Sequence, residues 1–217
     1  MTKNLIITRP NHDVETSYLH SFSKPIIKKL KGNKDIHTSN LEGTKANRSE
    51  FEKALLKTQA ALVFLNGHGN TQSVWGHNDQ PLLDFDNVKL TKDKIIYALA
   101  CDSLIELGEK SIRNGAKAYI GYGAAFMCVK DESRTSSPDI DMNAEPFRRA
   151  CNTLIEALIE GTRVEKAVQL TRKEYIKSIK AYGTSEDDPY GDAPLIGFAL
   201  TWNLDCLNHV GDGKAAF

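Results

Sequence analysis

Two segments of the chain each place a reactive side chain directly after a run of apolar residues. The apolar run 60–65 is followed by His68 between two glycines, and the run that begins at Ile95 ends in Cys101. An imidazole and a thiol are typical of nucleophilic catalysis, because the thiolate attacks a carbonyl carbon and the imidazole moves the proton. We therefore predict that Cys101 is a nucleophile and that His68 assists its deprotonation or protonates the leaving amine.

Backbone groups next to these side chains suit the same chemistry. Gly69 has no side chain beside His68, and its N–H together with that of Cys101 is predicted to form an oxyanion hole. Such a donor contributes roughly 3–4 kcal/mol in other enzymes. A capping-box pattern from Ser103 to Glu106 predicts a helix start just after Cys101, which favours the thiolate.

Short strand-like runs alternate with amphipathic helices, which predicts an α/β fold with a mostly parallel sheet. The predicted strands are 5–8, 36–41, 60–65, 94–100, 118–126 and 195–203, and the predicted helices are 14–31, with a break before Pro25, 47–57, 103–114, 144–161 and 162–179. No internal repeat or domain boundary is evident, so residues 1–217 are predicted to form one domain. In open parallel sheets, sites form beyond the carboxyl ends of the strands. If the strands before His68 and Cys101 are neighbours, the two side chains share one crevice.

Composition excludes several classes of function. The 217 residues are 41% hydrophobic, with 28 basic and 28 acidic side chains, so no nucleic-acid partner is expected to bind through net charge. The longest apolar runs hold six or seven residues, against the ~20 that cross a bilayer. We read no signal peptide, and the 4 cysteines form no CxxC pair, which favours a reducing cytoplasm.

Four segments in order resemble the caspase–gingipain–separase group of cysteine peptidases, called clan CD. A hydrophobic strand before His-Gly stands here as Leu62-Val-Phe-Leu-Asn-Gly-His68-Gly69, and one before Ala-Cys stands as Ile95-Ile-Tyr-Ala-Leu-Ala-Cys101-Asp-Ser. Downstream, Asn114-Gly-Ala-Lys-Ala-Tyr-Ile-Gly121 and the helix junction that begins at Leu158-Ile-Glu-Gly resemble segments of CHAT-type peptidases. The resemblance covers about residues 60–180.

The resemblance implies a caspase-like three-layer α/β/α sandwich and a Cys101/His68 dyad with no required third member. It implies no metal or other cofactor, and cleavage of a protein or peptide after a specific P1 side chain. Compact bacterial peptidases of this type are often effectors that cleave a pore-forming or toxic protein. The 217 residues leave no room for sensor modules, so regulation is expected from a separate partner, a bound ligand or self-cleavage, with cuts in 130–141 or 183–192.

The sequence leaves open whether the P1 side chain is basic or acidic. Relatives build the S1 pocket near the end of the first strand and near the loops after the later ones, where this chain offers Arg9, Asp13, Asp102 and Asp131. A pocket lined by carboxylates would favour a basic P1 residue, whereas Arg9 would favour an acidic one. Because there are more carboxylates than arginines among these positions, we predict a basic P1 residue. Asp13 and Asp102 also suit plain helix starts.

His68 and Cys101 each have a less specific, purely structural interpretation as well. His68 could be an ordinary turn residue between two glycines, and Cys101 could be an ordinary buried residue at the end of a strand. His77 is an alternative base, and zinc held by His68, His77 and Cys101 fits by ligand type but lacks a short ligand pair. A non-catalytic caspase-like or flavodoxin-like binding module is the alternative function, although no glycine-rich phosphate loop is present.

Overall fold

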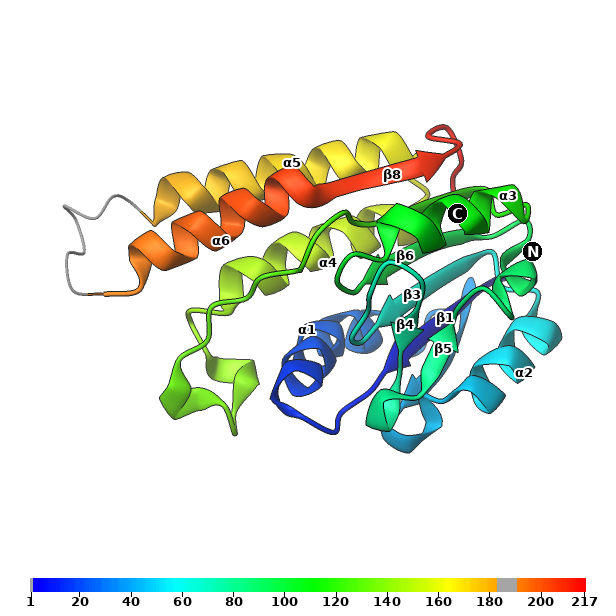
Figure 1. The fold of residues 1–217 in the computed structure, drawn as a ribbon, viewed down its shortest axis with the longest axis horizontal. Coiled ribbons are helices and arrows are strands. Elements are labelled where there is room, and N and C mark those ends of the chain that lie inside the picture. The colour runs from blue at the N-terminus through cyan, green and yellow to red at the C-terminus, as the bar shows by residue number, and fades with distance from the viewer. Residues whose placement is uncertain (1, 183–190) are drawn as a thin grey trace.

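The computed structural model describes residues 2–182 and 191–217, and its centre is a six-stranded sheet of order β2-β1-β3-β6-β7-β8 (Figure 1). The strands are β1 (Lys3–Arg9), β2 (Ile36–Glu42), β3 (Leu62–Asn66), β6 (Ile95–Leu99), β7 (Ala118–Tyr122) and β8 (Leu207–Gly211). All neighbours are parallel except β7 and β8. The strands β4 (Val74–Trp75) and β5 (Pro81–Leu83) form a separate antiparallel hairpin.

Helices cover both faces of the sheet, which confirms the predicted three-layer α/β/α sandwich. They are α1 (Val14–Leu30), α2 (Arg48–Thr58), α3 (Glu109–Arg113), α4 (Glu145–Ile159), α5 (Val164–Ala181) and α6 (Ala193–Cys206), with a π-helical turn at Leu104–Gly108 before α3. Short 3-10 helices lie at Gly43–Lys45, His77–Asp79, Val88–Thr91, Glu132–Arg134 and Pro138–Ile140. Among residues 2–182 and 191–217, none of the helices combines the length and the hydropathy that a bilayer span requires.

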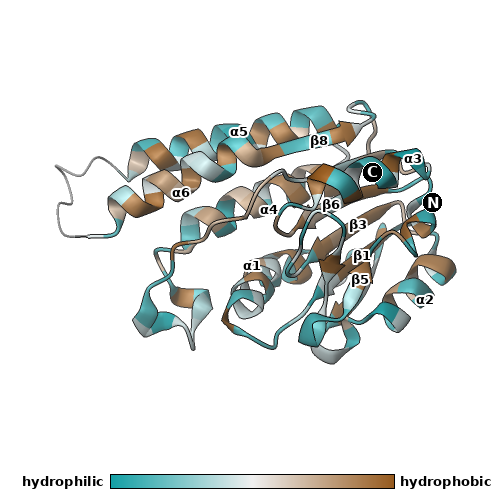
Figure 2. Cartoon of the chain, in the orientation of Figure 1, coloured by the Kyte–Doolittle hydropathy of each residue, from teal (hydrophilic) through white to brown (hydrophobic). Residues whose placement is uncertain are grey.

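Alternating strand residues pack into two cores, one on each face of the sheet. Leu5 and Tyr97 belong to the core formed with α1, α4, α5 and α6, whereas Ile6 and Ile96 belong to the core formed with α2 and the π-helical turn. Because both faces are covered, β6 is apolar along its whole length and β3 is apolar up to its last residue, Asn66, as their hydrophobic colour in Figure 2 shows. This explains why the strands before His68 and Cys101 read as continuous apolar runs.

The predicted strand 195–203 is wrong, because this segment is helix α6. Its buried residues follow a helical period, whereas Leu195, Phe198 and Trp202 are exposed on the opposite side. Apolar residues on both sides of a short helix resemble a buried strand in the sequence. The last strand is instead β8, which lies antiparallel to β7.

The predicted helix boundaries are partly confirmed. Asn47 caps α2 by accepting a hydrogen bond from the Glu50 N–H, and α1 continues through Pro25 without the expected break. The predicted caps Ser103 and Thr162 are wrong. Ser103 has helical dihedral angles and makes no capping hydrogen bond, and the residue before α5 is Arg163.

The segment 130–141, where a self-cleavage cut is predicted, is held against α1. Tyr18 Oη donates to Asp141 Oδ2 at 2.5 Å, and Ser21 Oγ donates to Asp139 Oδ1 at 2.7 Å. A cleavage site here would therefore have to be released from α1 first. In the second predicted cleavage loop, 183–192, residues 183–190 lie outside the described residues.

The two ends of the chain meet beside the first strand. The Lys3 Nζ donates to the Phe217 backbone oxygen at 2.6 Å and lies 5.1 Å from the centre of the Phe217 ring. Lys3 is the first residue of β1. The ends therefore lie where this strand begins (Figure 1).

Candidate active site

The strands before His68 and Cys101 are direct neighbours, as the prediction required. β3 and β6 pair in parallel with Asn66 opposite Leu99, and each reactive residue comes two positions after the paired end. The Gly67 N–H donates to the Leu99 oxygen at 3.4 Å, so the pairing continues past the strand ends. The imidazole and the thiol therefore start from equivalent positions at one edge of the sheet.

Close packing of the two loops depends on Gly69. A Cβ atom at this position would lie 2.8 Å from the Cys101 oxygen and 2.9 Å from the Ala100 Cβ. The loop after β3 thus rests directly on the backbone of Cys101. The N–H groups of Gly69 and Cys101 donate to no other residue within 2–182 and 191–217, and their role as oxyanion donors stays a prediction.

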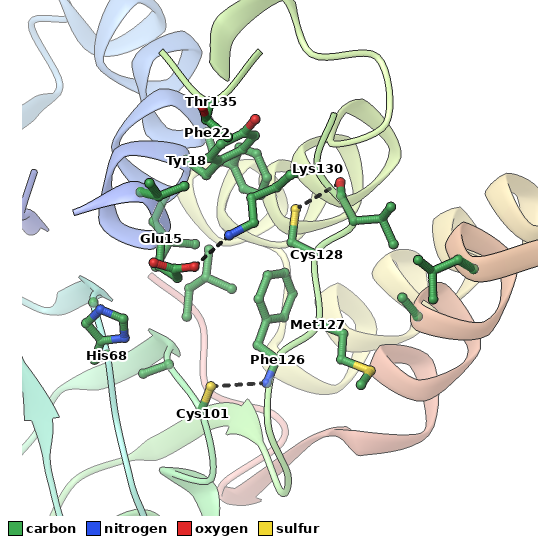
Figure 3. Close-up of a pocket in the computed structure, with 18 of the residues that line it drawn as sticks. Glu15, Tyr18, Phe22, His68, Cys101, Phe126, Met127, Cys128, Lys130 and Thr135 are labelled. Carbon is green, nitrogen blue, oxygen red and sulfur yellow. Dashed lines mark hydrogen bonds and ion pairs between the residues drawn. The ribbon is translucent and has the colours of Figure 1, made fainter. Parts of the chain in front are cut away.

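His68 and Cys101 line the same cavity, whose volume is about 590 Å³. Figure 3 shows them at one end, with Tyr18, Phe22 and Lys130 at the other. The walls come from α1, from the segment 126–130 after β7, and from α6. The cavity therefore opens a peptide-sized space directly beside the thiol and the imidazole.

Cys101 is half-buried and forms one hydrogen bond, accepted by its Sγ from the Phe126 N–H at 3.3 Å. Burial raises the pKa of the Cys101 thiol and the neighbouring Asp102 adds to this, while the Phe126 N–H acts in the opposite direction. Asp102 has a φ of +56°, and a π-helical turn follows it. The expected thiolate at a regular helix start is therefore not the resting form at neutral pH.

Asp13 holds the imidazole of His68. The Asp13 Oδ2 lies 2.7 Å from the His68 Nε2, and about a third of each side chain is exposed. Burial acts to raise the pKa of the Asp13 carboxyl, but hydrogen bonds from the Thr16 N–H and from His68 outweigh it and lower this pKa to about 2. Asp13 is therefore ionised at neutral pH, and the Nδ1 of His68 is left for other partners.

Asp13 is predicted to line the S1 pocket or to begin a helix. It does cap α1, in a capping box with Thr16, but its second carboxylate oxygen faces His68 and it does not line the cavity. The strand order explains the difference, since β1 is the other neighbour of β3. The ends of β1, β3 and β6 thus carry a carboxylate, an imidazole and a thiol in a row.

The structure does not bring the other predicted S1 residues to the cavity. Arg9 is 3% exposed, donates to Ser23 Oγ and the His20 oxygen, and pairs with Glu42. Asp102 lies in the left-handed turn after Cys101, and Asp131 caps a 3-10 helix through the Ser133 N–H. The charged residues that line the cavity are instead Glu15, Lys130 and Glu132.

His77 lies in the connection between β4 and β5 and does not line the cavity, which weighs against it as the base. Its ring packs edge-on against the ring of His12, with centroids 5.2 Å apart. Zinc ligands predicted at His68, His77 and Cys101 do not come together as a group within the described residues.

The fold of the protein is similar to that of a known peptidase structure, although its sequence matches no family model or curated protein. A scan against protein-family models and a search of curated proteins both find no match. Among solved structures, the complex of Porphyromonas gingivalis RgpB pro- and mature domains is similar, with a TM-score of 0.55 and 14% identity. The match covers 99% of this chain and 48% of that chain, so this chain spans about half of its length. The protein therefore has the caspase-like fold of a gingipain.

Proposed function

We propose that the protein is a cysteine endopeptidase in which Cys101 is the nucleophile and His68 carries the proton. The observation that supports this is the shared cavity, reached by both side chains from the carboxyl ends of adjacent strands. In addition, Asp13 is proposed as a positioning residue that holds His68 through Nε2. This adds a third member to the dyad expected from the sequence.

The proposed reaction begins when the His68 Nδ1 accepts the thiol proton as the Cys101 Sγ bonds to the carbonyl carbon of the scissile peptide. The oxyanion accepts hydrogen bonds from the N–H groups of Gly69 and Cys101. The imidazolium, stabilised by ionised Asp13, then gives its proton to the departing amine. Water, deprotonated by His68, hydrolyses the thioester and restores the thiol.

The Asp13→Asn variant tests the positioning role. Asparagine caps helices about as well as aspartate, so α1 should remain folded, while the negative charge beside His68 is lost. We expect kcat to fall by roughly 10²–10⁴-fold, with little change in KM or in the thermal midpoint. A kcat within a few-fold of wild type, measured with a fluorogenic peptide, would contradict this role. Asp131→Asn, at another cap outside the cavity, is the matched control.

We further propose a large apolar P1 side chain. Tyr18, Phe22 and Phe126 form much of the cavity wall, and the ion pair between Glu15 and Lys130 offsets its charge. The carboxylates on which a basic P1 was predicted, Asp13, Asp102 and Asp131, are absent from the described lining. An apolar side chain gains free energy from burial here, whereas a charged one loses hydration.

A P1-scanning peptide library, with the Cys101→Ala protein as the blank, tests activity and specificity together. Leu, Met or Phe at P1 should be cleaved at least about tenfold faster than Arg, Lys or Asp. A preference for Arg or Lys that disappears in Glu132→Gln would instead assign a basic pocket. Equal rates in wild type and blank would reject the peptidase.

The physiological setting is proposed on the resemblance alone: a cytoplasmic effector that cleaves a pore-forming or toxic protein. A separate activating partner or ligand is proposed on the same resemblance. Isolation of proteins retained by Cys101→Ala and absent from wild type tests the substrate.

A further inference from the structure

Four potential metal ligands from three separate segments meet beside the cavity. His12 and Asp13 follow β1, His68 follows β3, and Asp79 lies between β4 and β5. One ligand atom of each lies within 4.8 Å of the others. Two imidazoles and two carboxylates match the donor types of a tetrahedral zinc site.

Two of the six distances between these atoms match those around a common ion, and the others are no longer than 4.8 Å. The His12 Nε2 lies 3.4 Å from the Asp13 Oδ2 and 3.3 Å from the Asp79 Oδ1. Ligands about 2.0–2.2 Å from a tetrahedral zinc ion are themselves about 3.3–3.5 Å apart. The His68 Nε2, now 2.7 Å from the Asp13 Oδ2, needs to withdraw by less than 1 Å.

Thr16 orients two of the ligands from behind. Its N–H and its Oγ1 both donate to the Asp13 Oδ1 at 2.7 Å, and its Oγ1 lies 3.4 Å from the His12 Nδ1. The Asp13 Oδ2 and the His12 Nε2 are therefore the atoms left to face the cluster. Metal-binding histidines and carboxylates are commonly held by such outer partners.

The charge of the cluster also favours a cation. Within the described part of the chain, neither Asp13 nor Asp79 is paired with a lysine or an arginine; their ionic partners are His12 and His68. A divalent ion would neutralise both carboxylates and leave the imidazoles neutral, as metal binding requires. The two nitrogen ligands favour zinc over magnesium or calcium.

We propose that His12, Asp13, His68 and Asp79 bind Zn²⁺ and that the bound ion inhibits the peptidase. The inhibitory part rests on the proposed function; the binding does not. Zinc on the Nε2 of His68 leaves Nδ1 as the protonated nitrogen of a neutral ring. Such a ring has no free lone pair, so it cannot take the proton of Cys101.

Calorimetric titration of the full-length protein with ZnCl₂ tests the site without reference to activity. We expect one zinc per chain, and a Kd at least about tenfold higher in His12→Gln and in Asp79→Asn. Asp79 is 65% exposed, so its replacement should not disturb folding, and the exposed Asp86→Asn is the matched control. Cys101→Ala should bind as wild type does, and bound Co²⁺ should show no sulfur-to-cobalt charge-transfer band.

Two results would overturn the proposal. Zinc affinity lost in Cys101→Ala but kept in Asp79→Asn would place the ion on the thiol, and no binding at micromolar zinc would remove the site. Inhibition is measured as the zinc concentration that lowers each variant's activity to half of its activity in the presence of a chelator. This concentration should rise in His12→Gln by the same factor as the Kd for zinc. Zinc binding without any peptidase activity would refute the proposed function and leave the metal site standing.

Discussion

Replacement of Cys101 by alanine is expected to lower peptide cleavage by on the order of 10⁴-fold or more, because no other group supplies the sulfur that forms the acyl intermediate. The fold should persist. The substitution removes one atom from a half-buried side chain, and the Phe126 N–H that it leaves without its acceptor faces the cavity. Purified variant and wild type are compared by initial rates on the best library peptide and by thermal unfolding.

Cys206→Ala is the matched control, since Cys206 is also half-buried but lies outside the cavity lining. It should retain full activity. Cleavage by Cys101→Ala at a rate close to wild type would end the proposed mechanism. Loss of cleavage together with a midpoint lowered by more than about 5 °C would mean that the variant is also destabilised, and Cys101→Ser would then be compared in its place.

Gly67→Ala is expected to reduce the free energy of unfolding by at least about 3 kcal/mol and to remove activity with it. Gly67 has a φ of +155°, which side-chain-bearing residues rarely adopt, and a Cβ there would lie 1.9 Å from the Trp75 oxygen. The overlap is with backbone, so no side-chain rotation relieves it. The loop would have to move, and it carries His68. Urea unfolding followed by circular dichroism gives the change.

Two other glycines separate the causes of this loss. Gly32 has a φ of +80° but nothing within 4 Å of a built Cβ, so Gly32→Ala measures backbone strain alone, about 1–2 kcal/mol. Gly197 lies within α6 in open space, and Gly197→Ala should be neutral or stabilising. A Gly67→Ala loss no larger than that of Gly32→Ala would show that the contact with Trp75 is not limiting.

The sequence contains enough information to predict the two reactive residues and their strands. The apolar runs before His68 and Cys101 are continuous because both faces of β3 and β6 are covered, and such a run is visible without any structure. The glycines around His68 mark the turn that brings the loop onto Cys101. The α/β class and the central part of the fold follow from the same pattern.

The role of Asp13 was not predictable, because it depends on strand order. Nothing in the sequence states that β1 lies beside β3, and a helix-capping aspartate has an ordinary local explanation. The predicted strand at 195–203 is wrong because apolar residues occupy both the buried and the exposed side of α6. The raised pKa of Cys101 comes mainly from burial in the folded chain, and the Phe126 N–H that partly offsets it lies 25 residues further along the sequence.

The contact between Lys3 and the Phe217 backbone has a practical consequence for engineering. Lys3 and Phe217 meet at the start of β1, whereas the thiol and imidazole lie past the opposite ends of the strands, about 20 Å away along a seven-residue strand. Affinity tags or fluorescent fusions at either end would leave the mouth of the cleft open to large polypeptides. A short linker between the ends would equally allow circular permutants that keep all three strand ends intact.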